Sequence, residues 1–568
     1  MITERVDDIP LIMAELQKSN LADLLTQQIP DHGNWKGADS GTVAVIFLTY
    51  VLSEADHRTS HVQQWLSQRI HTMRSCTGMP TLNPLDLTDD RLGILLDKYS
   101  DDEHWRKFEM AHNQRIIQVY DLDLQNNPIR LDAMVTQSHR ETGGDFQIGY
   151  AKQHRADLPQ MKTMLATVDP FAVPLCSLTV AGNEADDGLY LPVIQELDQT
   201  LSIKHQLFVG DSKMGSIDNR AGIQALSHYY LTPLSKVQCS LAQLEKYLSA
   251  KPKKLQVLQI ETKDKSATIK AKAFEVSESV SNTDGSLIWN ERRIIVYSPA
   301  YGESQTKQLD KKLLKAQAEL DALLEPKQGR RYPKTYDEAQ KSVNEIIKSN
   351  KVKGLIDVQI TEIKTEKQVR AYGSKPAETR IVTKFELSYS INEVALQKRI
   401  NLMGWRAYAC NAPQEKLSTL DAVQCYRNEY RIEHKFDELL NRVTALMPVY
   451  LNKPNRIKAL IRLLLLALKY VSLIEMQVRT KLADTEQALK ELYPGNPGRA
   501  TNKPTIKMLL KAFEYLTLVM MPVGDKMIVK LTDLKPIQRK ILDLLNIEHN
   551  NYLKLEQIVF LPDNLSET

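Results

Sequence analysis

The stretch Ile129–Lys152, IRLDAMVTQSHRETGGDFQIGYAK, combines an apolar run, an acidic residue and a glycine turn. The first run carries Asp132 at a position where a strand normally has an apolar side chain. The sequence TGGD at Thr142–Asp145 supplies turn residues, and apolar residues then alternate over Phe146–Tyr150. This pattern predicts a β-hairpin whose first strand contains Asp132. The alternative to a functional carboxylate is an Asp that faces water at a strand end.

The segments that follow this stretch change from short β-rich runs to an alternation of strand and helix. This order predicts a mixed sheet flanked by helices, the first part of an α/β core over residues 116–235. The expected strands are 161–168, 173–181, 205–210 (HQLFVG) and 229–234, and the expected helices are 187–201 and 216–227.

Residues 1–115, ahead of the core, show apolar residues at helical spacing and no strand pattern. This region is predicted to be helical, and both DNA binding and simple packing are open to it. Its expected helices are 11–17, 42–52, 60–70, 89–99 and 103–119.

The region 236–405 differs in composition from both neighbours and is predicted to be an inserted β-rich domain with helices. Residues 406–482 then return to helix and complete the core, and 483–568 form a C-terminal appendage. The expected strands are 255–261, 268–275, 286–298, 358–363, 379–390 and 526–531, and the expected helices are 303–324, 336–349, 417–443, 455–482 and 505–516.

Length and composition place the chain among multidomain globular proteins. It has 568 residues, 42% of them hydrophobic, and 74 basic against 70 acidic residues give a net charge of +4. That balance neither requires nor excludes nucleic acid. Five cysteines without a CxxC pair fit a reducing compartment. The most apolar run, 461–468, is too short to cross a bilayer. We therefore expect a cytoplasmic protein that is not membrane-bound.

Three acidic residues stand out in this arrangement. Asp132 lies within the first core strand, Asp211 follows a buried-type strand, and Glu433 lies in the predicted helix 417–443. If the two strands are neighbours, both aspartates meet at one edge of the sheet, and the helix brings Glu433 across it. Carboxylate oxygens suit Mg²⁺, and two such ions about 4 Å apart can clamp a phosphodiester. An exposed acid in a solvated helix is the alternative for Glu433.

Four segments resemble a DDE transposase of the insertion-sequence-four superfamily: IRLDAMV, FQIGYAKQHRADLPQMK, HQLFVGDSKMGS and YRNEYRIEHKF. The likeness covers about residues 5–480, is weakest in the inserted region, and favours the subgroup with a helical region ahead of the catalytic core. It implies an RNase H-like mixed-sheet core, interrupted by an inserted β-rich α+β domain and flanked by N- and C-terminal helical regions.

The resemblance also implies a function. Asp132, Asp211 and Glu433 are the expected catalytic and metal-binding triad, holding two Mg²⁺ ions, with Mn²⁺ also accepted. The expected partners are double-stranded DNA, as terminal inverted repeats and as target, and a second copy of the chain in the DNA complex. The expected reaction is strand cleavage followed by strand transfer, with residues 1–115 binding the DNA ends.

The helix signature of this family, Y-x-x-R-x-x-x-E-x-x-x-x-x-x-K, is only partly present. Tyr426 and Glu433 match, but Glu429 stands where Arg is expected and Leu440 where Lys is expected. Arg431 is the nearest substitute for a phosphate contact, and Tyr426 is also expected to contact DNA. We expect Glu429 to turn away, toward a Lys or Arg of another element, because an uncompensated carboxylate beside the scissile phosphate opposes the reaction. The alternative is that Glu429 lies near the metals and that other basic groups offset its repulsion toward DNA.

Further DNA contacts are predicted at a basic cluster and at one tryptophan. Lys152, His154 and Arg155 follow the hairpin and suit phosphate, with a plain surface loop as the alternative. The resemblance implies that Trp289 can stack a displaced base, although a strand tryptophan is more often core.

Two other functions remain open at this stage. One is an RNase H-like endonuclease that cuts DNA without strand transfer. The other is a decayed relative that binds DNA but has lost its chemistry, against which the presence of all three acids argues.

Overall fold

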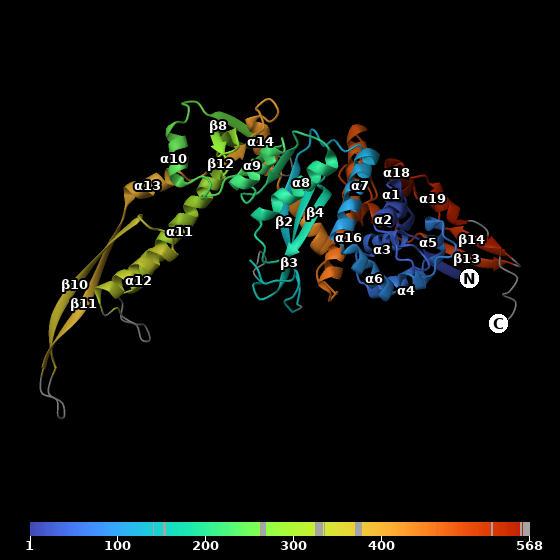
Figure 1. The fold of residues 1–568 in the computed structure, drawn as a ribbon, viewed down its shortest axis with the longest axis horizontal. Coiled ribbons are helices and arrows are strands. Elements are labelled where there is room, and N and C mark those ends of the chain that lie inside the picture. The colour runs from blue at the N-terminus through green and yellow to red at the C-terminus, as the bar shows by residue number, and fades with distance from the viewer. Residues whose placement is uncertain are drawn as a thin grey trace.

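The computed structural model describes residues 1–139, 141–150, 155–261, 268–323, 333, 335–369, 378–523, 526–556 and 559–560. The chain forms an elongated molecule with a mixed sheet in its middle, a helical body on one side and a long arm on the other (Figure 1). The sheet has nine strands in the order β4-β3-β2-β5-β6-β12-β9-β8-β7. The strand that carries Asp132, β2, is therefore an internal strand.

Strand β2 (Ile129–Gln137) pairs antiparallel with β3 (Gln160–Val168), and β3 pairs antiparallel with β4 (Val173–Ala181). On its other side β2 runs parallel to β5 (Leu207–Gly210), which runs parallel to β6 (Tyr229–Pro233). Nearly every residue of β2 and β3 is buried, as expected for strands covered on both faces. The predicted core strands are confirmed.

The predicted partner of β2 is wrong. Gly143 and Phe146 exchange two backbone hydrogen bonds of 2.9 and 3.1 Å, so the glycine turn closes on itself. Phe146 is buried, but Ile148 and Tyr150 are 49% and 84% exposed and belong to no strand. The alternating apolar residues of 146–150 are therefore one buried side chain, Phe146, and two exposed ones, Ile148 and Tyr150. The true hairpin partner is β3, further along the chain.

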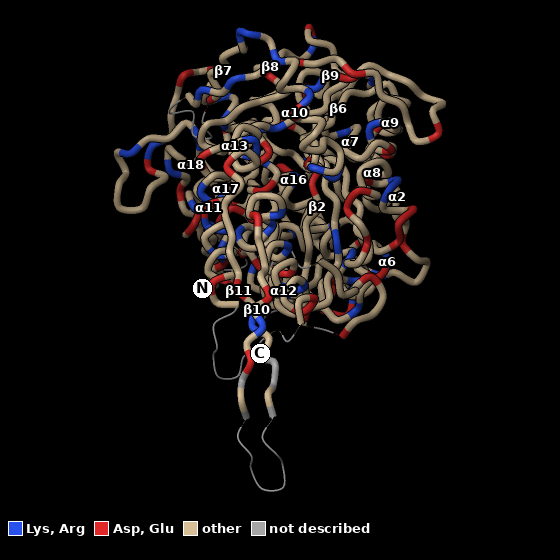
Figure 2. Tube along the Cα trace, turned by 90° about the vertical axis from the view of Figure 1, so that its left-hand side faces the viewer, with Lys and Arg blue, Asp and Glu red and all other residues tan. Residues whose placement is uncertain are grey.

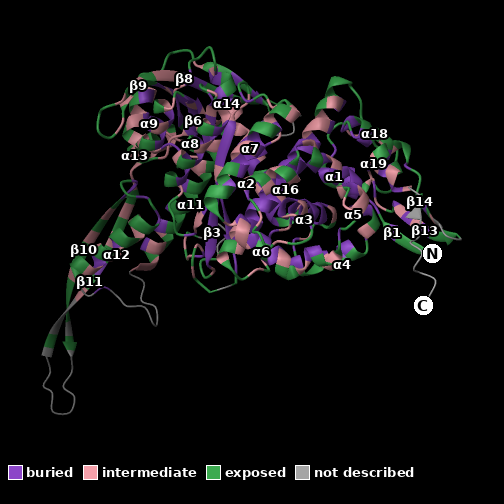
Figure 3. Cartoon of the chain, turned by 45° about the vertical axis from the view of Figure 1, so that its right-hand side comes forward, coloured by how far each residue is buried: buried purple, intermediate pink, exposed green. Residues whose placement is uncertain are grey.

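Helix α16 (Pro454–Asp484) joins the sheet to the N-terminal helices. Its side chains from Ala459 to Glu475 are buried almost without interruption (Figure 3). It packs against β4 on one side and against α3 (Ser40–Glu54) and α6 (Asp89–Tyr99) on the other. A helix buried on all sides is apolar all round, which explains the unusually apolar sequence of the predicted helix 455–482.

The N-terminal region is helical, as predicted, although two of its helices were not expected. The missed helices are α2 (Leu21–Gln28) and α5 (Ile70–Thr77), and the confirmed ones, besides α3 and α6, are α1 (Ile9–Lys18), α4 (Thr59–Ser67) and α7 (Asp102–Tyr120).

The first and last parts of the chain meet in a second sheet of order β1-β13-β14-β15. Strand β1 (Ile2–Arg5), which sequence reasoning missed, pairs with β13 (Thr517–Val523), and β13 pairs with β14 (Lys526–Leu531). The C-terminal segment is thus attached to the N-terminal helices. Its other elements are α17 (Ile506–Lys511), α18 (Pro536–Leu544), α19 (Asn550–Leu553) and β15 (Val559–Phe560).

The region predicted to be an inserted domain divides into two parts. The strands of its first part continue the core sheet, because β12 (Trp405–Cys410) pairs with β6 on one side and with β9 (Ile288–Tyr297) on the other. These strands therefore form no sheet of their own. The first part also contains β7 (Gln256–Glu261), β8 (Thr268–Ser281) and α10 (Leu241–Ser249).

The second part of this region forms the arm. Strands β10 (Ile356–Val369) and β11 (Glu378–Ile391) make a two-stranded ribbon that projects from the body (Figure 1). Helices α11 (Pro299–Leu323) and α12 (Tyr336–Ser349) pack along its base. Helix α13 (Glu393–Asn401) then leads the chain back to β12.

The predicted helix 417–443 is broken. Helix α14 (Thr419–Arg427) ends at Asn428, and α15 (Tyr430–Asp437) begins after Glu429 and continues as a π-helical turn, Glu438–Arg442. Asn428 and Glu429 form a turn between the two helices. The remaining helices, α8 (Tyr190–Leu201) and α9 (Ile217–Ala225), connect the core strands as predicted.

Candidate active site

Asp132 and Asp211 lie side by side on neighbouring parallel strands, Asp132 within β2 and Asp211 directly after the carboxyl end of β5. The register pairs Leu131 of β2 with Gly210 of β5, and each acid directly follows its member of this pair. Neighbouring strands are about 4.8 Å apart, so the two side chains leave the sheet from adjacent positions. The predicted adjacency of the two strands is confirmed.

Helices α14 and α15 cover the face of the sheet to which Asp132 belongs. Residues two apart in a strand share a face, and Arg130, two before Asp132, donates to the carbonyl oxygen of Cys425 in α14 at 2.7 Å. Val209, two before Asp211, packs in one apolar cluster with Tyr426 of the same helix. The covering helices and the two aspartates therefore meet at this edge of the sheet.

Neutral donors hold the carboxylate of Asp211. The Tyr190 hydroxyl donates to its Oδ1 at 2.7 Å, and the backbone N–H of Lys213 donates to the same atom at 2.8 Å. Burial raises the pKa of Tyr190 well above its usual value, and the charges of Asp211 and Asp132 raise it further. Tyr190 therefore stays protonated and donates a hydrogen bond throughout the neutral and moderately alkaline range.

The glycine at the end of β5 makes room for this tyrosine. A Cβ added at Gly210 would lie 3.0 Å from Cε1 of Tyr190 and 2.8 Å from Sδ of Met214. Both contacts are closer than carbon atoms in proteins normally approach. Sequence reasoning missed Tyr190, and the glycine immediately before Asp211 was the signal that another side chain packs closely there.

Glu429 lies at the break between α14 and α15, within electrostatic reach of Asp211. Burial raises the pKa of Glu429, a hydrogen bond with Tyr426 lowers it, and the charges of Asp211 and Glu433 raise it further. These interactions do not support the expectation that Glu429 turns away from the other acids toward a Lys or Arg. Glu429 and Glu433 are four residues apart, the spacing at which side chains share a helix face.

Glu433 lies one turn further along α15 and is exposed. It lines a cavity of about 500 Å³ together with Tyr426 and Glu429. The ring of Tyr426 packs 5.0 Å from that of Tyr408 in β12. Glu429 and Glu433 therefore share one cavity, and Tyr426 also lines the neighbouring cavity that contains Asp211.

Arg431, the predicted phosphate contact, binds a buried acid. Its Nη1 lies 2.8 Å from Oδ2 of Asp169. Nε and Nη2 of Arg130 donate hydrogen bonds to the same carboxylate at 2.9 and 2.7 Å. Arg130 and Asp169 are almost fully buried, whereas 21% of the Arg431 side chain is exposed. This ion cluster ties α15 to the sheet, which supports a structural role for Arg431.

The other predicted DNA contacts have different outcomes. Lys152 and His154 lie outside the described residues. Arg155 is exposed, and its guanidinium pairs with Asp157 at 2.8 Å. Trp289 in β9 is only 6% exposed, and its Nε1 donates to the hydroxyl of Tyr230 at 2.7 Å. Its burial supports the alternative that Trp289 is a core residue.

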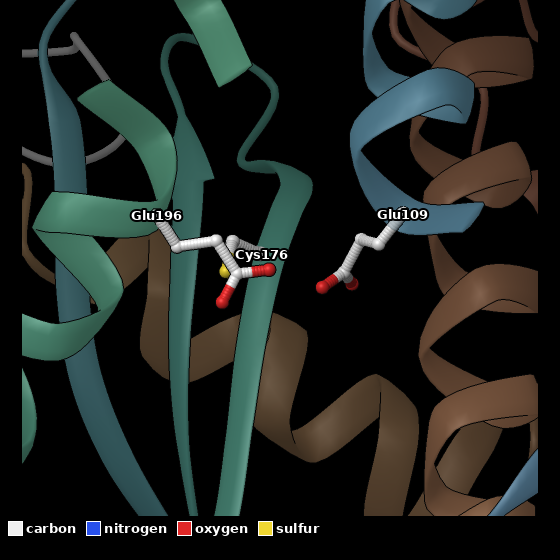
Figure 4. Close-up of side chains that lie close together, drawn as sticks. All are labelled: Glu109, Cys176 and Glu196. Carbon is white, nitrogen blue, oxygen red and sulfur yellow. The ribbon is translucent and has the colours of Figure 1, made fainter. Parts of the chain in front are cut away.

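A second acidic cluster, absent from the sequence analysis, joins Glu109 of α7, Cys176 of β4 and Glu196 of α8 (Figure 4). Their ligand atoms all lie within 4.8 Å of one another. Burial raises the pKa of Glu109 to about 7, against the opposing charge of Lys469 in α16. Burial likewise lowers the pKa of Lys469 to about 8. This cluster contains its own cation.

The two acidic clusters differ in how well they fit a divalent metal. Asp132, Asp211 and Glu433 offer only carboxylate oxygens, the donors that Mg²⁺ prefers. In the second cluster, burial raises the pKa of the Cys176 thiol well above its usual value, and a protonated thiol is a poor ligand. The ammonium of Lys469 also opposes a second cation there. The residues at the β2–β5 edge therefore fit magnesium, and those around Cys176 do not.

Comparisons with known proteins bear on this site. A comparison with curated proteins finds no match. Among solved structures, the chain is similar to a piggyBac transposase in a synaptic complex with hairpin DNA, with 10% identity and a TM-score of 0.23, over 83% of this chain and 81% of that chain.

Among the described helices, none combines the length and the apolar composition needed to cross a membrane. The sequence model of the family described as Transposase DDE domain matches residues 129–469. This match spans more than half of the chain and includes both strands of the sheet edge and the helix of Glu433. The chain belongs to the DDE-domain family of transposases.

Proposed function

We propose that this chain is the transposase of an insertion sequence of the insertion-sequence-four type, with an RNase H-like core. The observation that carries the proposal is the register that sets Asp132 beside Asp211 on parallel strands, with the α14–α15 helices across them. The strand order β4-β3-β2-β5-β6, with β3 alone antiparallel among β2, β3, β5 and β6, supports the proposed core.

Asp132, Asp211 and Glu433 would hold two Mg²⁺ ions, which when bound activate the attacking oxygen and stabilise the leaving oxygen of a phosphodiester. The protein's own residues position these carboxylates. Tyr190 fixes one oxygen of Asp211 by a hydrogen bond and leaves the other oxygen open to a ligand. The ion cluster of Arg130, Asp169 and Arg431 holds α15, and with it Glu433, against the sheet.

We add Glu429 to the residues proposed to support the metal site. Relatives place Arg where this chain has Glu429, and here its carboxylate lies within electrostatic reach of Asp211 and Glu433. We assign it a supporting role for the metal site, as a ligand or as a charge that draws the cations in. The repulsion that it adds toward phosphate must then be offset by basic side chains elsewhere on the DNA path.

The proposed reaction is cleavage at the ends of the mobile DNA segment followed by transfer of the 3′-hydroxyl to target DNA, in a homodimer. End recognition is assigned to residues 1–115. Within that region Arg69 is buried against Glu54 at 2.9 Å and Arg74 donates to the Leu82 carbonyl at 2.9 Å, so neither is a good phosphate contact. Arg106, which is exposed on α7, is a better candidate.

The test uses purified full-length protein and a plasmid that carries the coding sequence with its native flanking DNA. We expect Asp132→Asn, Asp211→Asn and Glu433→Gln each to lower Mg²⁺-dependent strand cleavage by about a thousandfold or more, a barrier increase of about 4 kcal/mol. Folding and DNA binding should persist. Near wild-type cleavage by any one variant would remove that residue from the triad.

The same assay separates a transposase from a simple nuclease. Joined products between the cleaved ends and a second plasmid are expected for a transposase. Cleavage without any joined product would instead favour the endonuclease alternative.

A further inference from the structure

The cavity that contains Asp211 is lined by basic side chains from five separate segments. It has a volume of about 470 Å³ and lies between the end of β5 and the base of the arm. Of the described residues, Asp211 is the one acid that lines it. The basic side chains are Lys236 before α10, Lys312 of α11, Lys351 after α12, Arg399 of α13 and Arg406 of β12.

These five cations have no acidic partner among the residues that the structure describes. Within the described ranges, none of the five forms an ion pair, whereas Lys315 and Lys398 on the same helices pair with Glu319 and Glu245 at 3.8 and 2.8 Å. Lys and Arg are elsewhere interspersed with Asp and Glu along the chain (Figure 2). Unpaired cations that converge on one cavity from five segments are not explained by a solvated helix face.

The geometry of the cavity suits an extended strand. Residues Tyr301 to Lys312 of α11 line it at helical spacing, a distance of about 16 Å at 1.5 Å per residue. One strand of B-form DNA spans about five nucleotides over that length, at 3.4 Å per nucleotide. The guanidinium of Arg406 lies 3.8 Å above the ring of Tyr301, which fixes it at the boundary with the neighbouring cavity of Glu429 and Glu433.

We propose that this cavity binds one strand of DNA through its phosphates and leads that strand to Asp211. The basic side chains supply the positive charge that the cluster of Asp211, Glu429 and Glu433 lacks, so a polyanion can approach carboxylates that would otherwise repel it. The inference rests on the proposed function, since it takes DNA as the ligand. It assigns a binding role to the base of the arm and to α13.

The test measures binding of a fluorescent DNA duplex of arbitrary sequence over a series of salt concentrations. Each lost phosphate contact reduces the slope of log affinity against log salt by about 0.9. The double variant Lys312→Gln/Arg399→Gln should therefore lose about 1.8 from the slope. The matched control, Lys315→Gln/Lys398→Gln, removes the same charge from the same helices and should leave the slope unchanged.

Charge-retaining substitutions guard against an effect on folding. Lys312→Arg/Arg399→Lys should bind with the wild-type slope. An unchanged slope in the Gln double variant, or an equal loss in the control, would overturn the proposed cavity. Cleavage by Asp211→Asn, measured on the same preparations, separates the two proposals. If Asp211→Asn is inactive but the slopes do not change, only the cavity assignment fails; if Asp211→Asn cleaves normally, the proposed function fails.

Discussion

The molecule contains two clusters of acidic side chains near its central sheet, and they have opposite surroundings. Around Glu109 and Glu196 the carboxylates are enclosed with Lys469, which supplies a positive charge within the protein. The carboxylate of Asp211 accepts hydrogen bonds from a hydroxyl and a backbone N–H, and a cavity opens beside it. The Glu109 cluster already contains a positive charge, so we assign it a structural role. Asp211 accepts hydrogen bonds from neutral donors beside a cavity, so it is suited to bind a cation from solution.

The largest stability effect is expected in the enclosed cluster. Lys469→Met should cost about 3 kcal/mol of unfolding free energy, because it removes the positive charge near the buried Glu109 and the hydrogen bond that Lys469 donates to Asn113. The double variant Glu109→Gln/Lys469→Met should recover most of that loss, since neutral groups replace the pair. Chemical denaturation measures both. If the double variant is no more stable than the single one, the two side chains do not act as a pair.

The pH dependence of stability follows from the same pair. The folded-state pKa of Glu109 is raised to about 7, so its contribution to stability falls as pH rises from about 4.5 to 7. The pKa of Lys469 is lowered to about 8, so its contribution falls as pH decreases from about 10.5 to 8. The stability of the double variant should lack both of these pH dependences. Its free energy of unfolding should therefore be highest relative to wild type between pH 7 and 8, where Glu109 and Lys469 are both charged in the wild-type protein.

Glu429 should behave as part of the open cluster. We expect Glu429→Gln to lower cleavage by about 10- to 100-fold, or about 1.4 to 2.7 kcal/mol of barrier, and to raise the Mg²⁺ concentration needed for half-maximal rate. The reason is its electrostatic contact with Asp211 and Glu433. Unchanged cleavage and Mg²⁺ dependence would show that this carboxylate has no part in the site.

Sequence reasoning found the two strands and their aspartates because both lie in short apolar runs with ordinary strand periodicity. It missed the break after Arg427, because no Pro or Gly marks it. For Glu429 it gave more weight to repulsion toward phosphate than to the four-residue spacing that brings Glu429 and Glu433 to one helix face. It also failed at Phe146–Tyr150, where a buried Phe beside a turn imitated a strand. Contacts that join distant segments, as in the Glu109 cluster, leave no local pattern to detect.

The smallest effect is expected from Tyr190, which positions Asp211 without touching substrate. Tyr190→Phe keeps the packing against Gly210 and removes one hydrogen bond to a carboxylate. Cleavage should fall by about tenfold or less, near 1.4 kcal/mol, with a higher Mg²⁺ requirement and little change in thermal stability. A loss of stability without any shift in Mg²⁺ dependence would make Tyr190 a packing residue only.

The central claim, that the open cluster and not the enclosed one holds the metal, is tested most directly by Mn²⁺ binding. Electron paramagnetic resonance would compare wild type with Asp132→Asn/Asp211→Asn and with Glu109→Gln/Glu196→Gln, each checked for folding by thermal melting. The account predicts that the Asp variant loses tight Mn²⁺ binding and that the Glu variant retains it. Retention by the Asp variant, or loss by a folded Glu variant, would contradict the account.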